Sequence, residues 1–235
     1  VINYVPTYKI ERSGGEEWAS DHWFTTLCGD DEFADVILGR ISVSNLKDAQ
    51  SVITKLIKYE TERVPGIWHA MLGYVADDGE FDEQCEDLRK KYTPPHYGSQ
   101  TVYLERFPWE DNFYLPKQLV EQEKAKVSTA ATSRIKEIID KGLVLLTFYG
   151  HGSPNIWADE RMWFGGDSEN SDNLNLRNGS KLPFIINMTC NSGAIDYPVP
   201  KWNICISEDF MRVSKGGAIG MYVPAGPGFT SQHKK

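Results

Sequence analysis

The apolar residues of this chain gather into short runs separated by segments with helical spacing. Two runs are almost continuous, Leu143–Tyr149 and Pro183–Thr189, and each predicts a strand that is buried on both faces. Shorter apolar runs predict further strands over residues 36–43, 67–75, 101–104 and 217–223. Strands that are apolar throughout, without polar alternation, are typical of parallel sheets covered by helices on both faces.

Helical patterns fall between these runs. Five apolar residues recur on one helix face just after two possible N-caps, Ser44 and Asn45: Ala49, Val52, Ile53, Leu56 and Ile57. Further helices are predicted over 82–92, 128–141 and 207–215, and loops over 107–126 and 165–182. The alternation of strands and helices predicts an α/β fold, a three-layer α/β/α sandwich with a mostly parallel sheet, in a single domain over residues 1–235.

Composition narrows the function classes. The 235 residues carry a net charge of −8 and have no basic cluster, which argues against a nucleic-acid partner. No apolar run reaches the roughly 18 residues of a membrane span. Four cysteines, none in CxxC spacing, argue against a zinc knuckle and leave the disulfide status of Cys28, Cys85 and Cys205 open.

Two reactive side chains follow the two clearest strands. His151 comes after the first and Cys190 after the second, and ligands of parallel sheets bind at the carboxyl ends of strands. A thiol beside an imidazole is the minimal pair for acyl transfer, and the backbone N–H groups of Gly152 and Cys190 are candidate oxyanion donors. The alternative is a small core cysteine and a histidine that caps a strand end.

Three segments around these residues resemble the gingipain-type cysteine peptidases of the caspase-like clan: Tyr149–Ser153, Leu182–Ile185 and Thr189–Gly193. The resemblance continues through Ala19–Phe24 and Asp35–Ile41 and covers residues 3–225. It implies a caspase-like sandwich and a cysteine endopeptidase. In that enzyme His151 is the general base, Cys190 is the nucleophile, and Gly152 and Cys190 form the oxyanion hole.

The resemblance also assigns acidic residues. Asp77 or Asp78 falls where the family places an acid near the catalytic histidine. Asp82 falls near the acid that lines the specificity pocket of arginine-cleaving members, which implies Arg or Lys before the scissile bond. The alternative for Asp82 is an N-cap of the helix that follows.

Some signals keep two interpretations. No cofactor is expected for catalysis, but the family binds structural calcium, and two acidic clusters, Asp30–Glu32 and Asp77–Glu80, suit that ion. Neither has EF-hand spacing, so solvated acidic loops are the alternative. Trp157 and Trp163 either wall the cleft or belong to the core. Asn178-Gly179-Ser180 is a glycosylation sequon in a loop.

The reaction has alternatives too. A protein or peptide substrate is expected, and the acyl group passes either to water or, as in the sortase of the type IX secretion pathway, to an amine. An inactive peptidase-like module in a surface assembly, or a metal-dependent hydrolase, are the other classes. The resemblance implies an extracellular or cell-surface location. Because the chain starts at Val1 without Met or signal peptide, we expect a segment of a longer polypeptide, whose fold flanking domains or other chains complete.

Overall fold

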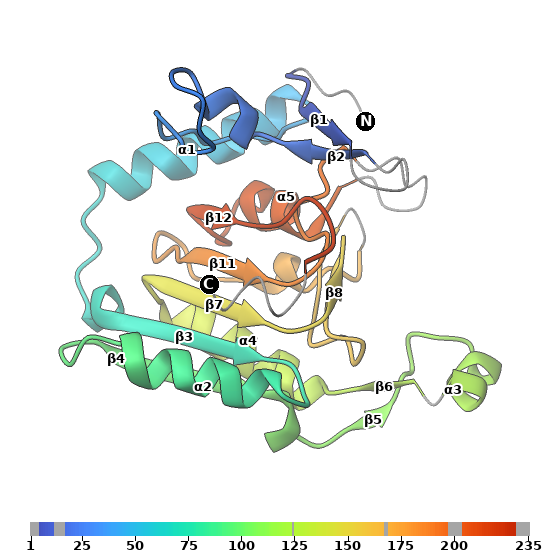
Figure 1. Cartoon of the computed structure of the whole chain (residues 1–235). Coiled ribbons are helices and arrows are strands. Elements are labelled where there is room, and N and C mark those ends of the chain that lie inside the picture. Colours follow the sequence, from blue (N-terminus) through green and yellow to red (C-terminus); the bar gives the residue numbers. More distant parts are fainter. Residues whose placement is uncertain (1–4, 12–16, 124, 167–168, 197–203, 229–235) are drawn as a thin grey trace.

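The computed structural model describes residues 5–11, 17–123, 125–166, 169–196 and 204–228. Its centre is a five-stranded sheet in which every neighbouring pair is parallel. Across the sheet the order is β4 (Gly98–Tyr103), β3 (Met71–Ala76), β7 (Leu145–Tyr149), β11 (Phe184–Met188) and β12 (Gly220–Tyr222) (Figure 1). The chain therefore leaves β3 toward one side of the sheet and returns as β7 on the other.

Helices cover both faces of this sheet. Helix α2 (Phe81–Tyr92) lies on one face, and α4 (Thr129–Lys141) and α5 (Ile206–Arg212) lie on the other, where α1 (Leu46–Thr61) packs against α5 (Figure 1). The predicted three-layer α/β/α class is confirmed. In the described part of the chain, no helix has the length and apolar character needed to cross a bilayer.

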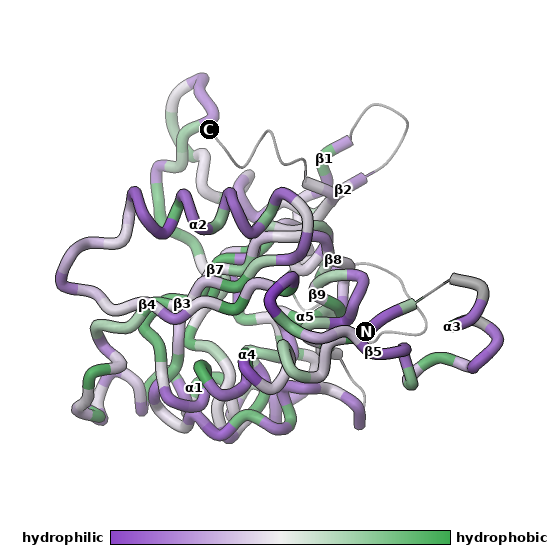
Figure 2. Tube along the Cα trace, turned by 90° about the horizontal axis from the view of Figure 1, so that it is seen from below, coloured by the Kyte–Doolittle hydropathy of each residue, from purple (hydrophilic) through white to green (hydrophobic). Residues whose placement is uncertain are grey.

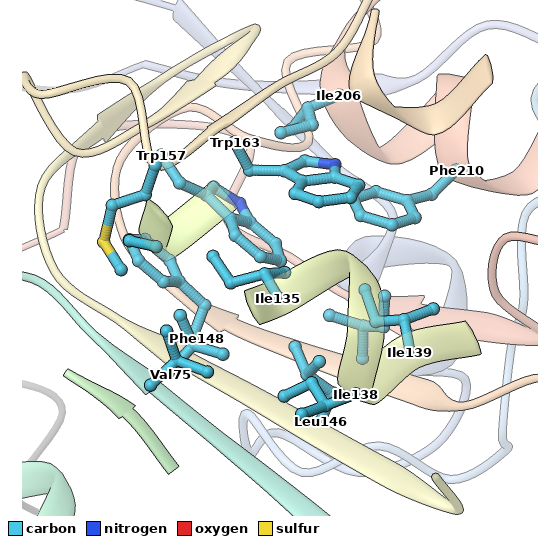
Figure 3. Packing of buried hydrophobic residues seen from close by; sticks show 14 of the residues in the cluster. Val75, Ile135, Ile138, Ile139, Leu146, Phe148, Trp157, Trp163, Ile206 and Phe210 are labelled. Carbon is cyan, nitrogen blue, oxygen red and sulfur yellow. The ribbon is translucent and has the colours of Figure 1, made fainter. Parts of the chain in front are cut away.

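The sheet separates two cores because side chains alternate along each strand. On β3, Leu72, Tyr74 and Ala76 face α2, whereas Val75 faces α4. The larger core lies on the α4 side, and Figure 3 shows its aromatic centre between sheet and helices. The Trp157 ring stacks on Phe148 at 4.6 Å, and both tryptophans are fully buried, so Trp157 and Trp163 are core residues and not cleft walls.

Local capping explains where α1 and α4 begin and where α4 ends. The Asn45 side chain accepts from the backbone N–H of Asp48 at 2.9 Å and starts α1. The Ser128 hydroxyl accepts from the N–H of Ala131 at 3.3 Å and starts α4. Gly142 ends α4 with φ of 100°, a conformation that a side chain would strain.

The chain also forms short strands and helices outside the central sheet. Strands β1 (Tyr8–Glu11) and β2 (Glu17–Ser20) pair as an antiparallel hairpin outside the main sheet (Figure 1). The chain after His151 folds into three short antiparallel strands: β8 (Gly152–Ser153), β9 (Ile156–Trp157) and β10 (Trp163–Phe164). The predicted loop 107–126 contains β5 (Glu110–Asp111) and α3 (Lys117–Glu123), and it runs into β6 (Lys126–Val127). Short 3₁₀ turns occur at His22–Thr25, Ile67–Ala70, Leu104–Arg106 and Asp172–Asn175.

The predicted strand over residues 36–43 is wrong. This segment has no strand partner among the described residues, and Ile37 is fully exposed. Side-chain bonds hold it instead, because Arg40 pairs with Asp21 at 2.6 Å and the Ser42 hydroxyl donates to Glu208. An apolar, β-branched run forms a strand only where a neighbouring strand offers its backbone groups.

The loop over residues 165–182 is only partly the surface loop that its composition predicts, because buried residues alternate with exposed ones along its described part. Asn178 is buried, and its amide donates to the carbonyls of Lys181 and Gly217 at 3.1 and 2.9 Å. Asn173 is also buried, and its amide donates to the Asp209 carboxylate at 2.8 Å. These asparagines replace backbone partners that the irregular segment lacks, so the sequon residue is not accessible in the folded chain.

Candidate functional site

Three loops leave adjacent strands at the carboxyl edge of the sheet. Asp77 follows β3, His151 lies two residues beyond the end of β7, and Cys190 lies two residues beyond the end of β11. The last residues of these strands pair in register, Ala76 and Met188 each with Tyr149. The strand order reverses between β3 and β7, which is the point where open parallel sheets bind ligands.

Hydrogen bonds continue this alignment past the strand ends. The N–H of Asp77 donates to Tyr149 O at 3.0 Å, and the N–H of Gly150 donates to Met188 O at 3.2 Å. The chain then turns, and the N–H of His151 donates to the Asp77 carboxylate at 2.9 Å. Asp77 thus fixes the backbone that carries the imidazole. Its carboxylate also accepts from the N–H of Asp78 at 2.9 Å, so the acid that bonds to the His151 backbone is Asp77 and not Asp78.

Phe81, the first residue of α2, contacts the His151 ring. The two rings meet edge to face, with centroids 5.0 Å apart and planes 82° apart, and Phe81 makes a similar contact with Tyr149. Such pairs stabilise by about 0.5–1.5 kcal/mol. The imidazole itself is exposed, with one side packed against this phenyl ring.

The loop that carries Cys190 is held by the segment after β12. The N–H of Asn191 donates to Gly226 O at 3.0 Å, and the N–H of Gly193 donates to Pro224 O at 2.9 Å. Asn191 adopts φ of 55°, a left-handed conformation that is uncommon outside glycine. The half-buried Cys190 thiol lies 3.6 Å from Gly228 O, to which it donates.

Gly152 sits where no side chain fits. A Cβ at this position would lie 2.3 Å from Thr189 Oγ1 and 3.0 Å from Ile156 O. The N–H of Ala158 donates to His151 O, so the alternation of an antiparallel ladder puts Gly152 opposite Trp157 in a pair without hydrogen bonds. The N–H of Gly152 therefore points away from β9, as an oxyanion donor requires.

Three carboxylates gather beside this histidine loop. Oxygens of Asp77, Asp78 and Glu160 lie within 4.8 Å of one another, the one such group of potential metal ligands among the described residues. Burial raises the pKa of Asp77 to about 6, against the lowering effect of its hydrogen bonds. Burial, followed by the charges of Asp77 and Asp78, raises the pKa of Glu160 to about 7. Burial, with some repulsion from neighbouring carboxylates, therefore disfavours the ionised forms of Asp77 and Glu160.

The remaining residues singled out in the sequence lie as follows. Asp82 is the second residue of α2, one position after Phe81, so it is not the N-cap. The acidic segment 30–32 is exposed and forms no gathered ligand group in the described part of the chain. All four cysteines are free thiols, and burial raises the pKa of Cys85 and of Cys205 to about 12. Cys28 is exposed.

Sequence reasoning missed Phe81 and Glu160. An apolar residue directly before a predicted helix is a signal that could have placed Phe81 against a neighbouring loop. Glu160 had none, because it lies in a turn whose two left-handed residues, Ala158 and Arg161, are not glycines. That turn depends on the packing of β9 and β10 in the core.

Comparisons with known proteins show the family of this chain. The family model described as peptidase family C25 matches residues 2–235. The chain belongs to this family. Within C25, it is 27% identical to gingipain R2 of Porphyromonas gingivalis over 207 residues, which cover 84% of this chain and 24% of that protein. Gingipain R1 of the same species is 26% identical over 84% of this chain and 18% of its own length.

Solved gingipain structures share the fold. The Arg-specific cysteine proteinase gingipain R (RgpB) superposes with a TM-score of 0.63 at 21% identity, over 90% of this chain and 45% of that one. The complex of the P. gingivalis RgpB pro- and mature domains gives a TM-score of 0.62 at 22% identity, over 90% and 46%. The caspase-like fold is thereby confirmed. The chain spans under a quarter of the length of its curated relatives and under half of these solved chains.

Proposed function

We propose that this chain is a cysteine endopeptidase in which Cys190 is the nucleophile and His151 carries protons. The main support is the in-register pairing of β7 with β11. This pairing brings the loops that carry His151 and Cys190 to one edge of the sheet, on adjacent strands. Membership of a cysteine peptidase family supports it. The free, half-buried thiol of Cys190 and the exposed ring of His151 are both available to a bound peptide.

The reaction follows from these positions. The Cys190 sulfur attacks the scissile carbonyl carbon, and the N–H groups of Gly152 and Cys190 donate to the developing oxyanion. His151 gives its proton to the leaving amine as the C–N bond breaks, leaving a thioester on Cys190. Water then attacks the thioester and passes a proton to His151, the acid product leaves, and the thiolate is restored. Asp77 acts on the backbone of His151, as a positioning residue.

A thiol-directed peptide probe tests the nucleophile. Wild-type protein is expected to label and to cleave a fluorogenic peptide, and Cys190→Ala to do neither. Cys28→Ala is the matched control because Cys28 is also free and exposed but lies outside the site. Equal labelling of wild type and Cys190→Ala, or cleavage that survives Cys190→Ala, refutes the assignment; chelator-sensitive cleavage would then indicate a metal-dependent hydrolase.

We propose that the substrate carries Arg or Lys before the scissile bond and that the Asp82 carboxylate binds this basic side chain. The position of Asp82 in the first turn of α2, next to the Phe81 that touches His151, supports it, as does the Arg-specific proteinase among the similar folds. Cleavage-site profiling of wild type and Asp82→Asn tests this. A profile without basic preference, or one that Asp82→Asn leaves unchanged, removes the assignment.

The fate of the acyl group is measured in the same assay. We expect hydrolysis, with the free acid as product. Addition of a peptide amine and mass analysis of the products distinguishes transfer, because a ligated peptide then replaces the acid. An inactive structural module is the outcome if neither product forms and no probe reacts.

We propose calcium as a structural ion held by Asp77, Asp78 and Glu160. All three donors are carboxylate oxygens, which suit this hard cation. Thermal unfolding with calcium and with chelator tests the proposal. Wild type is expected to melt at higher temperature with calcium, and Glu160→Gln to lose the difference; an equal shift in Glu160→Gln contradicts this site.

We also propose an extracellular or cell-surface location and contacts with further segments of a longer polypeptide. Similarity to gingipains supports the location, and a solved complex of pro- and mature domains supports the contacts. Cell fractionation of the native source, with mass analysis of the mature chain, tests both. An intracellular chain limited to these residues contradicts them.

A further inference from the structure

Residues 109–123 and 125–127 belong to an arm that projects from the body of the protein (Figures 1 and 2). Strands β5 and β6 pair at its base, with Glu110 opposite Val127, and α3 lies at its far end. Figure 2 shows an apolar stretch between β5 and α3. The arm exposes four large apolar side chains within seven positions: Trp109, Phe113, Tyr114 and Leu115. Apolar groups gathered on an exposed projection mark a contact surface.

The arm is held in a fixed position. At its base the Ser128 hydroxyl donates to Pro108 O at 2.9 Å, and the N–H of Asn112 donates to Ala125 O at 3.1 Å. The buried Arg161 guanidinium lies 3.8 Å from the centre of the Tyr114 ring. Phe113 beside it remains 61% exposed. A surface ordered before binding loses less conformational entropy on contact with a partner.

The base of the arm adjoins the candidate active site. The N–H of Ser128 donates to Glu160 O at 3.3 Å, and the Glu160 carboxylate belongs to the cluster with Asp77. Asp77 in turn holds the N–H of His151. A continuous path of contacts therefore connects the arm to the loop of the proposed base.

Exposed carboxylates lie beside this path. Glu105 accepts from the N–H of Gly79 at 3.1 Å, and Glu110 accepts from the Thr129 hydroxyl at the base of the arm. Two cations nearby are already paired, Lys126 with Asp111 at 2.5 Å and Arg161 with Asp172 at 3.5 Å. A peptide that crosses this surface from the site to the arm therefore gains from basic residues opposite Glu105 and Glu110 and from an apolar side chain at the arm.

We propose that the arm is an exosite for the polypeptide substrate, which it grips by an aromatic or aliphatic side chain beyond a basic stretch next to the scissile bond. The inference rests on the proposed function, since the substrate is the occupant. Extended polypeptide advances about 3.3 Å per residue, so a tripeptide ends near the scissile bond and a long peptide continues toward the arm.

Binding to the full chain carrying Cys190→Ala tests the exosite without catalysis. The probes are two long basic peptides, one with Phe and Leu on both sides of the cleavage site and one with Ser at those positions. We expect the apolar peptide to bind about tenfold more tightly, a difference that corresponds to about 1.4 kcal/mol. Adding Phe113→Ser is expected to remove that preference, and Tyr92→Ser, which alters another exposed ring at the end of α2, to keep it.

Cleavage gives the second readout. In otherwise wild-type protein, Phe113→Ser is expected to lower about tenfold the ratio of kcat/KM for the apolar peptide to that for the serine peptide. A preference that persists in Phe113→Ser overturns the exosite, as does a dimer that Phe113→Ser dissociates without a change in the ratio. If the proposed peptidase function is wrong, wild-type protein cleaves neither peptide. The binding measurement then still shows whether the arm prefers the apolar peptide.

Discussion

The carboxylate of Asp77 accepts a hydrogen bond from the backbone N–H of His151 at 2.9 Å. This bond crosses from the loop after β3 to the loop after β7, and it constrains the main chain of the histidine without touching its ring nitrogens. A buried carboxylate in this role orients a residue through its backbone. The expected consequence is that Asp77 matters for geometry and stability together.

Asp77→Ala is expected to lower the free energy of unfolding by about 1–3 kcal/mol, because it leaves the backbone N–H groups of His151 and Asp78 without their acceptor. Displacement of the His151 loop is expected to lower kcat/KM by about 10²-fold. Urea unfolding and peptide cleavage measure the two effects. Asp78→Ala is the comparison, and equal losses in both variants would contradict the distinction between the two acids.

Gly152→Ala is expected to cost about 1–3 kcal/mol of stability and most of the activity, because the new methyl would overlap Thr189 Oγ1. Thermal melting and peptide cleavage report both. Gly39→Ala is the control, since nothing lies within 4 Å of an added Cβ there. A fully active Gly152→Ala would show that this N–H does not need its present position.

Lys55→Met is expected to change the pH dependence of stability. Burial lowers the pKa of Lys55 to about 7, against the opposing charge of Asp209. The unfolded chain keeps this proton up to the ordinary pKa of about 10.4, so the free energy of unfolding rises with pH from about 7 toward 10. Urea titrations across that window should show a flatter profile for Lys55→Met. An unchanged slope would place the titration elsewhere.

Asn178→Ala is expected to lower the free energy of unfolding by about 2–3 kcal/mol, because its amide serves both the N–H and the carbonyl of Gly217. Asn175→Ala, on the same loop but exposed, should cost little. Expression in a glycosylating host should leave the mass of the folded chain free of glycan at Asn178. A glycan there would mean that the loop is modified before it folds.

Sequence alone located the parts of the fold that follow from local pattern. The apolar runs of β7 and β11 are long enough to exclude exposure, and Ser128 and Gly142 mark the ends of α4 by their capping chemistry. The run over 36–43 shows the limit of such patterns. Its residues favour a strand, but pairing depends on a neighbour that the local sequence does not encode.

In the candidate site, too, some residues follow from local sequence pattern and others depend on tertiary packing. The placement of His151 and Cys190 at one edge of the sheet was predictable, because residues that follow buried parallel strands lie at the carboxyl edge of the sheet. Glu160 and the arm were not, because tertiary packing sets their positions. Composition also misled at Asn178, which is polar and yet buried. An asparagine amide can pair with buried backbone groups as readily as with water, so polarity alone does not predict exposure.

The order of the central strands has a consequence for how this protein can diversify. Asp77, His151 and Cys190 each follow directly on a strand end, so register within the sheet sets their mutual positions and the lengths of the intervening loops do not. Descendants of such a chain can gain or lose residues in the connections between the strands and keep these three residues in place. Changes at the periphery of the fold can therefore accumulate while the arrangement at the centre stays constant.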